Sequence, residues 1–207
     1  TLILSLYFLV LLILGVFGLH RYAMVYLYRR YRDNKAALRA LRQGIEPPRV
    51  TVQLPLYNEM YVVDRLIESV AAISYPRDRL EIQVLDDSTD ETTAIAESAV
   101  ARARSLGLDI KLVHRELRTG FKAGALQNGL EIAKGDFILI FDADFIASPD
   151  ILEKSLGHFE DPRVGMVQAR WGHVNRDYSL LTELQSIMLD GHFVVEHNRG
   201  HHNRVAT

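Results

Sequence analysis

Hydrophobic positions along the chain follow two alternating patterns. Short apolar runs typical of buried strands occupy residues 50–54, 80–85, 109–114, 137–141 and 164–169. Segments with the apolar spacing of amphipathic helices lie between them, at residues 60–73, 91–106, 122–133 and 149–159. Strands and helices that alternate in this order predict an α/β fold with a mostly parallel sheet covered by helices on both faces.

One of the predicted helices has a specific start signal. Ser88 is followed three residues later by Glu91. This spacing matches a capping box, in which two side chains satisfy free amides of the first helical turn. We therefore expect Ser88 to cap the helix at residues 91–106.

The beginning of the chain is apolar over a much longer stretch. No residue from Leu2 to Leu19 is charged, and the apolar stretch continues to Leu27 with only His20 and Arg21 interrupting it. At a rise of about 1.5 Å per residue, a helix of this length spans a hydrocarbon core of ~30 Å. We predict a transmembrane helix at residues 1–28.

Two other interpretations of this stretch are a signal peptide and a buried core helix. A signal peptide has its positive charges before the apolar region, whereas here they follow it, at Arg29, Arg30, Arg32 and Lys35. Positive residues on this flank predict that it faces the cytoplasm. We therefore expect an integral membrane protein whose folded domain is cytoplasmic.

Charge and composition refine this organisation. The formal net charge of −2 divides into +6 over residues 1–49 and −8 over the remainder. We expect a basic juxtamembrane linker at residues 29–49 and one folded domain at residues 50–207. The chain has no cysteine, which excludes disulfides and cysteine-ligated metals. Because it begins at Thr1 rather than methionine, we expect its natural N-terminus to be missing.

Polar residues gather where three of the predicted strands end. The segments are "PLYNE" (55–59), "DDSTD" (86–90) and "DADF" (142–145). Each alone is compatible with a solvated loop. In open α/β sheets, however, ligands bind outside the carboxyl ends of the strands, so the three segments together predict one pocket.

Asp142 and Asp144 directly follow an apolar strand. Two aspartates two residues apart in an extended segment point the same way, so they can share one cation or its water shell. Hard oxygen ligands suit Mg²⁺ or Mn²⁺, which commonly use one or two carboxylates and take other ligands from substrate phosphates. We predict a site for one of these two ions.

The segment "RTGFKAGALQNG" (118–129) places three glycines around Lys122, where a loop passes into a helix. Backbone amides at a helix start and a lysine favour an anion. Neither the P-loop pattern nor G-x-G-x-x-G is present. We therefore expect a phosphate-bearing ligand that is bound without either motif.

At these segments the chain resembles the family 2 glycosyltransferases, in particular the cellulose-synthase-like mannan and glucomannan synthases. The matching segments are "PLYNE", "IQVLDDSTDET", "GFKAGAL", "FDADF" and "MVQARWGHVN", and the resemblance covers roughly Val50 to His197. The resemblance implies a GT-A, Rossmann-like fold and a nucleotide sugar bound across the strand ends, with the catalytic domain cytoplasmic. The implied donor-binding residues are Tyr57, Asn58, Glu59, Asp86, Asp87 and Lys122. Asp142 and Asp144 would hold the divalent cation on the diphosphate.

The activity implied is inverting transfer of a hexose to a growing β-linked polysaccharide, with GDP-mannose favoured as donor. The partners would be a nucleotide sugar, a polysaccharide acceptor and the lipid bilayer, without nucleic acid. Alternatives are a glucan synthase that uses UDP-glucose, a non-processive transferase for lipid-linked sugars, and a non-catalytic membrane-tethered nucleotide-binding module. No spacing of residues distinguishes mannose from glucose.

The later motifs of the family are missing: an F-x-G-T/S acceptor segment, a Glu-Asp pair that supplies the general base, and Q-x-x-R-W. The "QARW" at 168–171 has only one residue between Gln168 and Arg170. We expect the chain to contain the donor-binding half, with the general base beyond Thr207, and to be inactive alone.

Two interpretations from other classes are weaker. A haloacid-dehalogenase-like phosphatase would use Asp142 as a nucleophile, but that class places this strand first and has Thr or Val where Ile146 stands. A zinc site is conceivable at His192, His197, His201 and His202. The five-residue spacing of the first two places them off one helical face, so we predict an amphipathic helix at residues 179–197 instead.

Overall fold

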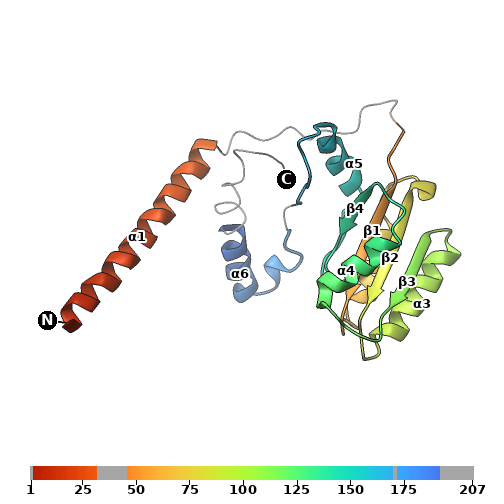
Figure 1. Cartoon of the computed structure of the whole chain (residues 1–207), viewed down its shortest axis with the longest axis horizontal. Coiled ribbons are helices and arrows are strands. Elements are labelled where there is room, and N and C mark those ends of the chain that lie inside the picture. Colours follow the sequence, from red (N-terminus) through yellow and green to blue (C-terminus); the bar gives the residue numbers. More distant parts are fainter. Residues whose placement is uncertain (1, 32–45, 170–171, 192–207) are drawn as a thin grey trace. The chain divides into compact units, whose positions relative to one another are not determined.

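The structure is a computed structural model, and it describes residues 2–31, 46–169 and 172–191 (Figure 1). It divides into two compact units, Arg39–Gly157, and Thr1–Leu38 together with His158–Thr207. Most of the predicted linker lies outside the described residues, as do the four histidines.

A parallel four-stranded sheet forms the centre of the first unit. Its strands are β1 (Val50–Leu56), β2 (Leu80–Asp86), β3 (Asp109–His114) and β4 (Phe137–Ile140). Their order is β3-β2-β1-β4, and every neighbouring pair is parallel. The predicted α/β fold with a parallel sheet is confirmed.

The helices of this unit alternate with the strands. They are α2 (Val63–Ala71), α3 (Thr92–Ser105), α4 (Phe121–Glu131) and α5 (Ile151–Leu156). The chain steps from β1 to β2 to β3 in one direction and then returns to β4 on the other side of β1. Because such crossovers are right-handed, α2 and α3 cover one face of the sheet and α4 covers the other. The reversal creates a switch point between β1 and β4, where ligands of such folds bind.

The core is apolar on the face that α2 and α3 cover. Alternate residues of β1 and β2 are fully buried there, including Val52, Leu54 and Ile82. The buried residues of α2 are Val63, Leu66, Ile67 and Val70, as its periodicity predicted. This face therefore supplies the hydrophobic stabilisation of the fold.

The face under α4 contains a buried polar layer instead. The Gln53 side-chain amide donates to Gln83 Oε1 at 3.1 Å and to the Leu126 carbonyl of α4 at 3.4 Å. A Cβ at Gly129 would lie only 2.6 Å from Gln53 Nε2 and 2.7 Å from Gln83 Oε1. Glycine at this position therefore lets α4 approach the sheet closely.

A buried carboxylate belongs to the same layer. Glu81 accepts hydrogen bonds from Thr51 Oγ1 at 2.7 Å and from the Lys134 amide at 2.8 Å, and it pairs with Lys111 at 2.7 Å. Burial alone would raise the pKa of Glu81, but the bonds from Lys111, Thr51 and Lys134 lower it below its usual value. The ionised carboxylate thus ties β1, β2 and β3 to the turn before β4.

Three local predictions were wrong. Residues 164–169 form no strand, since an apolar run needs a partner strand and none of the described strands pairs with it. Ser88 does not cap α3, because its hydroxyl accepts from the Asn58 amide and Asp90 caps the Thr92 amide instead. The predicted helix at residues 149–159 is α-helical only in α5 and continues as a 3₁₀ turn.

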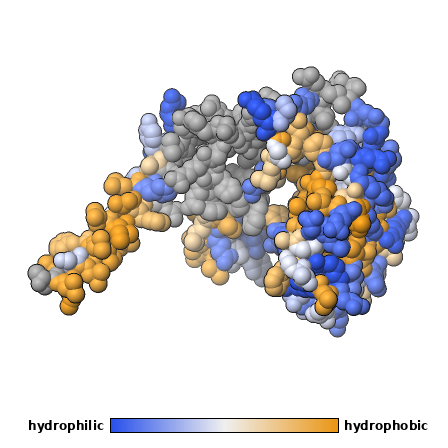
Figure 2. Space-filling model, in the orientation of Figure 1, coloured by the Kyte–Doolittle hydropathy of each residue, from blue (hydrophilic) through white to orange (hydrophobic). Residues whose placement is uncertain are grey.

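The second unit contains two described α-helices. Helix α1 (Leu2–Tyr31) is continuous, and apolar side chains are exposed along it (Figure 2). Its segment Leu2–His20 is long and apolar enough to cross a membrane. Helix α6 (Leu180–Gly191) lies within the predicted amphipathic segment and exposes Leu180 and Met188 while it buries Ser186.

Candidate functional site

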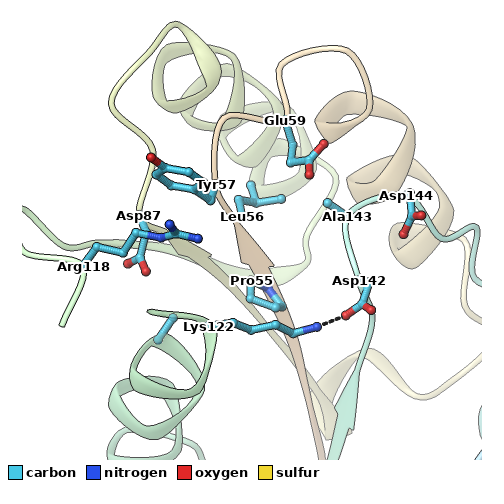
Figure 3. Close-up of a pocket in the computed structure, with 11 residues that line it drawn as sticks. Pro55, Leu56, Tyr57, Glu59, Asp87, Arg118, Lys122, Asp142, Ala143 and Asp144 are labelled. Carbon is cyan, nitrogen blue, oxygen red and sulfur yellow. Dashed lines mark hydrogen bonds and ion pairs between the residues drawn. The ribbon is translucent and has the colours of Figure 1, made fainter. Parts of the chain in front are cut away.

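A pocket of about 450 Å³ lies at the carboxyl ends of β1, β2 and β4, next to the switch point (Figure 3). Its volume falls in the range typical of small-molecule sites. The lining residues are Pro55, Leu56, Tyr57, Glu59, Asp87, Arg118, Lys122, Ala125, Asp142, Ala143 and Asp144. The structure thus brings the three polar segments into one pocket, as predicted from the strand ends.

The segment after β1 has two different functions. Tyr57 and Glu59 line the pocket. Asn58 does not line the pocket, and its backbone has a positive φ of 55°. Its amide donates to Ser88 Oγ at 3.0 Å, and its side-chain oxygen accepts from the Thr89 amide at 3.0 Å. Asn58 therefore holds the loops after β1 and β2 together from outside the pocket.

Asp86, at the end of β2, is also a structural residue in this arrangement. It is fully buried and accepts from the Ser88 amide at 3.0 Å, Thr93 Oγ1 at 2.7 Å and His114 Nδ1 at 2.8 Å. Burial alone would raise the pKa of Asp86, but these hydrogen bonds lower it below its usual value. Asp86 thus fixes the loop that presents Asp87.

Asp87 lines the pocket but is already paired with an arginine that sequence reasoning missed. Arg115 Nε donates to Asp87 Oδ1 at 2.7 Å, and its Nη2 donates to Oδ2 at 2.5 Å. This two-point geometry is the strongest form of arginine–carboxylate contact, and it raises the pKa of Arg115 above its usual value. No motif marked Arg115, which stands five residues before Gly120, the first glycine of the loop between β3 and α4.

Arg118 is a second missed residue and lines the pocket directly. Its guanidinium carbon lies 3.4 Å from the centre of the Tyr57 ring and 5.2 Å from that of Phe121. Figure 3 shows the guanidinium between Tyr57 and the Lys122 side of the pocket. A cation held on an aromatic face is stabilised by the ring electrons. The available signal was its place at the start of "RTGFKAGALQNG".

Lys122 lies in the first turn of α4, where the predicted loop passes into the helix. Its ammonium group pairs with Asp142 across the pocket (Figure 3). Arg118 and Lys122 therefore place two positive charges on the α4 side of the pocket, and free amides of the helix start add partial positive charge. This environment favours an anion such as a phosphate.

Asp142 and Asp144 both line the pocket, but they are not in an extended segment as predicted. Strand β4 ends at Ile140, and the Phe145 amide donates to the Asp142 carbonyl at 3.1 Å, which closes a turn. The turn, rather than strand alternation, brings both residues to the pocket. Among the described residues, Asp144 has no hydrogen-bond or ion-pair partner, so its oxygens are available to a ligand.

The donor set fits a hard divalent cation that a substrate helps to hold. Within the described residues, no three His, Asp or Glu side chains are placed to hold a metal ion by themselves. Mg²⁺ and Mn²⁺ sites with two carboxylates take their other ligands from phosphates and water. Asp142 and Asp144 therefore suit an ion that arrives with a phosphorylated ligand, which the cationic side of the pocket also favours.

Comparison with known proteins gives one family over most of the chain. The sequence model of "Glycosyl transferase family 2" matches residues 51–205. Glucomannan 4-beta-mannosyltransferase 2 from Arabidopsis thaliana is 44% identical over 158 residues, which are 74% of this chain and 30% of that protein. Glucomannan 4-beta-mannosyltransferase 1 from Cyamopsis tetragonoloba is 39% identical over 86% of this chain and 35% of its own length. The chain therefore spans about a third of the length of these relatives.

One solved structure is similar in both sequence and fold. It is the mannosyltransferase PcManGT from Pyrobaculum calidifontis, in complex with GDP-Man and Mn²⁺. The similarity covers 77% of this chain and 46% of that chain, with 32% identity and a TM-score of 0.58. The match confirms the architecture predicted from the alternation of strands and helices.

Proposed function

Because this chain belongs to glycosyltransferase family 2 and has the GT-A fold, we propose that its pocket binds GDP-mannose and that the protein transfers mannose to a β-linked mannan or glucomannan. The support is the mannosyltransferase relatives and the structural neighbour that is complexed with GDP-Man. The proposal concerns the whole protein, of which this chain holds the donor site.

One observation carries the proposal: a carboxylate pair and two cationic side chains face the same pocket at the switch point of the sheet. A nucleoside diphosphate needs both, since its phosphates pair with cations directly and with carboxylates through a divalent ion. We assign Lys122 and Arg118 to the diphosphate. We assign Tyr57, Glu59 and Asp87 to the nucleoside, with Tyr57 offering a ring face for stacking.

Asp142 and Asp144 are the proposed ligands of Mg²⁺ or Mn²⁺. Such an ion, when bound, neutralises the negative charge that develops on the departing nucleoside diphosphate. Lys122 and Arg118 add positive charge at the same group, and they act without reorganisation because the fold holds them in place. Asn58 and Asp86 contribute indirectly, by fixing the loops that present Tyr57 and Asp87.

The stereochemical outcome we propose is inversion, which requires a base for the acceptor hydroxyl. We assign that function to no residue of this chain and keep the prediction of a base beyond Thr207. Helix α1 is the proposed membrane anchor, since its apolar side chains are exposed and it is long enough to span a bilayer. The donor pocket would then lie on the cytoplasmic side of the membrane.

Nucleotide binding to the detergent-solubilised chain tests the proposal. We expect calorimetry to give tighter binding for GDP than for UDP or ADP, and only with Mn²⁺ or Mg²⁺ present. Asp142→Asn should remove the metal dependence. Asp78→Asn is the matched control, because Asp78 is exposed and lies outside the pocket.

The other results would each reject a part of the proposal. A preference for UDP would favour the alternative donor UDP-glucose. Absence of any nucleotide binding would leave a module without a donor site, and binding that does not depend on a metal would overturn the assignment of Asp142 and Asp144.

A further inference from the structure

Arg115 lies behind the pocket rather than in it, and no motif singles it out. We propose that Arg115 is a positioning residue: it holds the strained loop between β3 and α4, and thereby sets Arg118 and Lys122 at their places in the pocket. The inference deepens the proposed function, on which it rests.

The contacts of Arg115 join two separate elements of the site. Two of its nitrogens bind both oxygens of Asp87, at the end of β2. Its Nη1 also donates to the Thr119 carbonyl at 3.2 Å, and its Nη2 to the Phe121 carbonyl at 3.1 Å. The side chain is only 15% exposed. One planar guanidinium thus fixes the loop to the strand end through four hydrogen bonds, which a lysine cannot reproduce.

The loop needs such support because its backbone is strained. Gly120 has a φ of +72°, and Phe121 has a φ of +50°. Glycine adopts a positive φ freely. A bulky residue in this left-handed conformation costs about 1–3 kcal/mol, and the conformation persists only when its surroundings hold it. The Phe121 side chain is 66% exposed, so packing of its ring contributes little. The bonds from Arg115 to the carbonyls on both sides of Gly120 supply the missing restraint.

The loop and the first turn of α4 are in close contact, so a displacement of one moves the other. A Cβ at Gly124 would overlap the Thr119 carbonyl oxygen and come within 3.0 Å of Arg115 Nη1. The Gly124 amide also donates to the Gly120 carbonyl at 2.9 Å. Arg118 precedes the loop and Lys122 follows it, so their side chains depend on its conformation.

The inference is tested by nucleotide affinity in the detergent-solubilised chain, measured by calorimetry with GDP and Mn²⁺. Arg115→Lys keeps the positive charge beside Asp87 but loses the planar guanidinium that makes the four hydrogen bonds. We expect this variant to bind GDP roughly 10-fold to 100-fold more weakly, as for other residues that orient ligand-binding groups. Arg102→Lys is the control, because Arg102 also pairs with an aspartate, Asp64, but away from the pocket.

A second variant separates positioning from simple loss of stability. Phe121→Gly removes the strain, so in the Arg115→Lys background it should recover at least part of the lost affinity. A non-additive double-mutant cycle would be the signature of this coupling. Gly124→Ala disturbs the loop from the side of α4 without a substitution at Asp87 or Arg115, and it should also weaken GDP binding.

The outcomes distinguish this inference from the proposed function. If the unmodified chain fails to bind GDP, the proposed function is wrong. If it binds GDP, and Arg115→Lys binds equally well, the positioning role is wrong. Strictly additive effects of Arg115→Lys and Phe121→Gly would overturn it as well.

Discussion

Two pairs of aspartates at the strand ends look alike in sequence but differ in burial and in hydrogen bonding. Asp86 and Asp87 are almost completely buried, and hydrogen bonds engage the oxygens of both. Asp142 is partly exposed and pairs only with Lys122 among the described residues, and Asp144 is exposed. Both residues of the first pair help to fix the framework of the site, although Asp87 also lines the pocket, and the second pair has oxygens that are available to a ligand.

The difference follows from the strands that precede each pair. β2 is a central strand, flanked by β1 and β3, and its end lies under the loops of both neighbours. β4 is at the edge of the described sheet, and the turn from Asp142 to Phe145 follows it. A buried carboxylate must be hydrogen-bonded because its desolvation is costly, whereas an exposed one keeps free lone pairs. The location of the preceding strand in the sheet therefore decides which aspartates are held by hydrogen bonds within the protein and which keep oxygens free for a ligand.

Removal of a framework aspartate should have the largest effect. Asp86→Ala leaves the Ser88 amide, Thr93 and His114 without their shared acceptor, which should lower the free energy of unfolding by about 3 kcal/mol. Urea denaturation followed by circular dichroism measures this. Asp144→Ala, at an exposed position, should change it by no more than about 0.5 kcal/mol. Equal effects of the two substitutions would contradict the comparison.

The second pair should show the opposite behaviour. Asp142→Asn removes a proposed metal ligand, so Mn²⁺-dependent affinity for GDP should fall by about 100-fold or more, beyond the effect of orienting residues. The melting temperature should stay close to that of the unmodified chain. A large fall in melting temperature without loss of affinity would assign Asp142 to the framework instead.

Lys122→Met sharpens the account of the second pair. Loss of this cation should weaken GDP binding about 10-fold, because a charged hydrogen bond to phosphate is worth about 1.5–3 kcal/mol. Binding of Mn²⁺ alone should become tighter, since Asp142 is freed from its partner. Stability should change by about 1 kcal/mol at most, as for other exposed ion pairs. Weaker binding of Mn²⁺ alone would contradict this interpretation.

The pH dependence of stability should report the buried carboxylates Asp86 and Glu81. The folded-state pKa values of Asp86 and Glu81 lie below their usual values, so unfolding takes up protons. The stability that these groups provide is complete above their unfolded pKa values of about 4 and is lost as the pH falls through the lowered ones. Unfolding measured from pH 7 to pH 2 should therefore show a flat region and then a decline. Glu81→Gln should reduce the decline.

The sequence predicted the fold well because its signals are local and periodic. The helical spacing of Val63, Leu66 and Val70 and the position of strand β3 were recognised with little error. The position of the pocket was also predictable, because the carboxyl ends of parallel strands meet at one edge of a sheet. The assigned residues Asn58 and Asp86 lie beside the pocket instead of lining it, since which side chain turns inward depends on the loop conformation.

The sequence by itself determined an α/β fold of this family, an apolar N-terminal helix, and acidic and glycine-rich segments at the strand ends. Composition and residue spacing are sufficient to predict these three features, because each feature depends on residues that are close together along the chain. Only the tertiary structure decided that Asp87 is held by Arg115, that Arg118 stacks on Tyr57, and that a turn presents Asp142 and Asp144. These are contacts between segments that lie far apart in the chain or conformations set by packing, and neither leaves a periodic signal in the sequence.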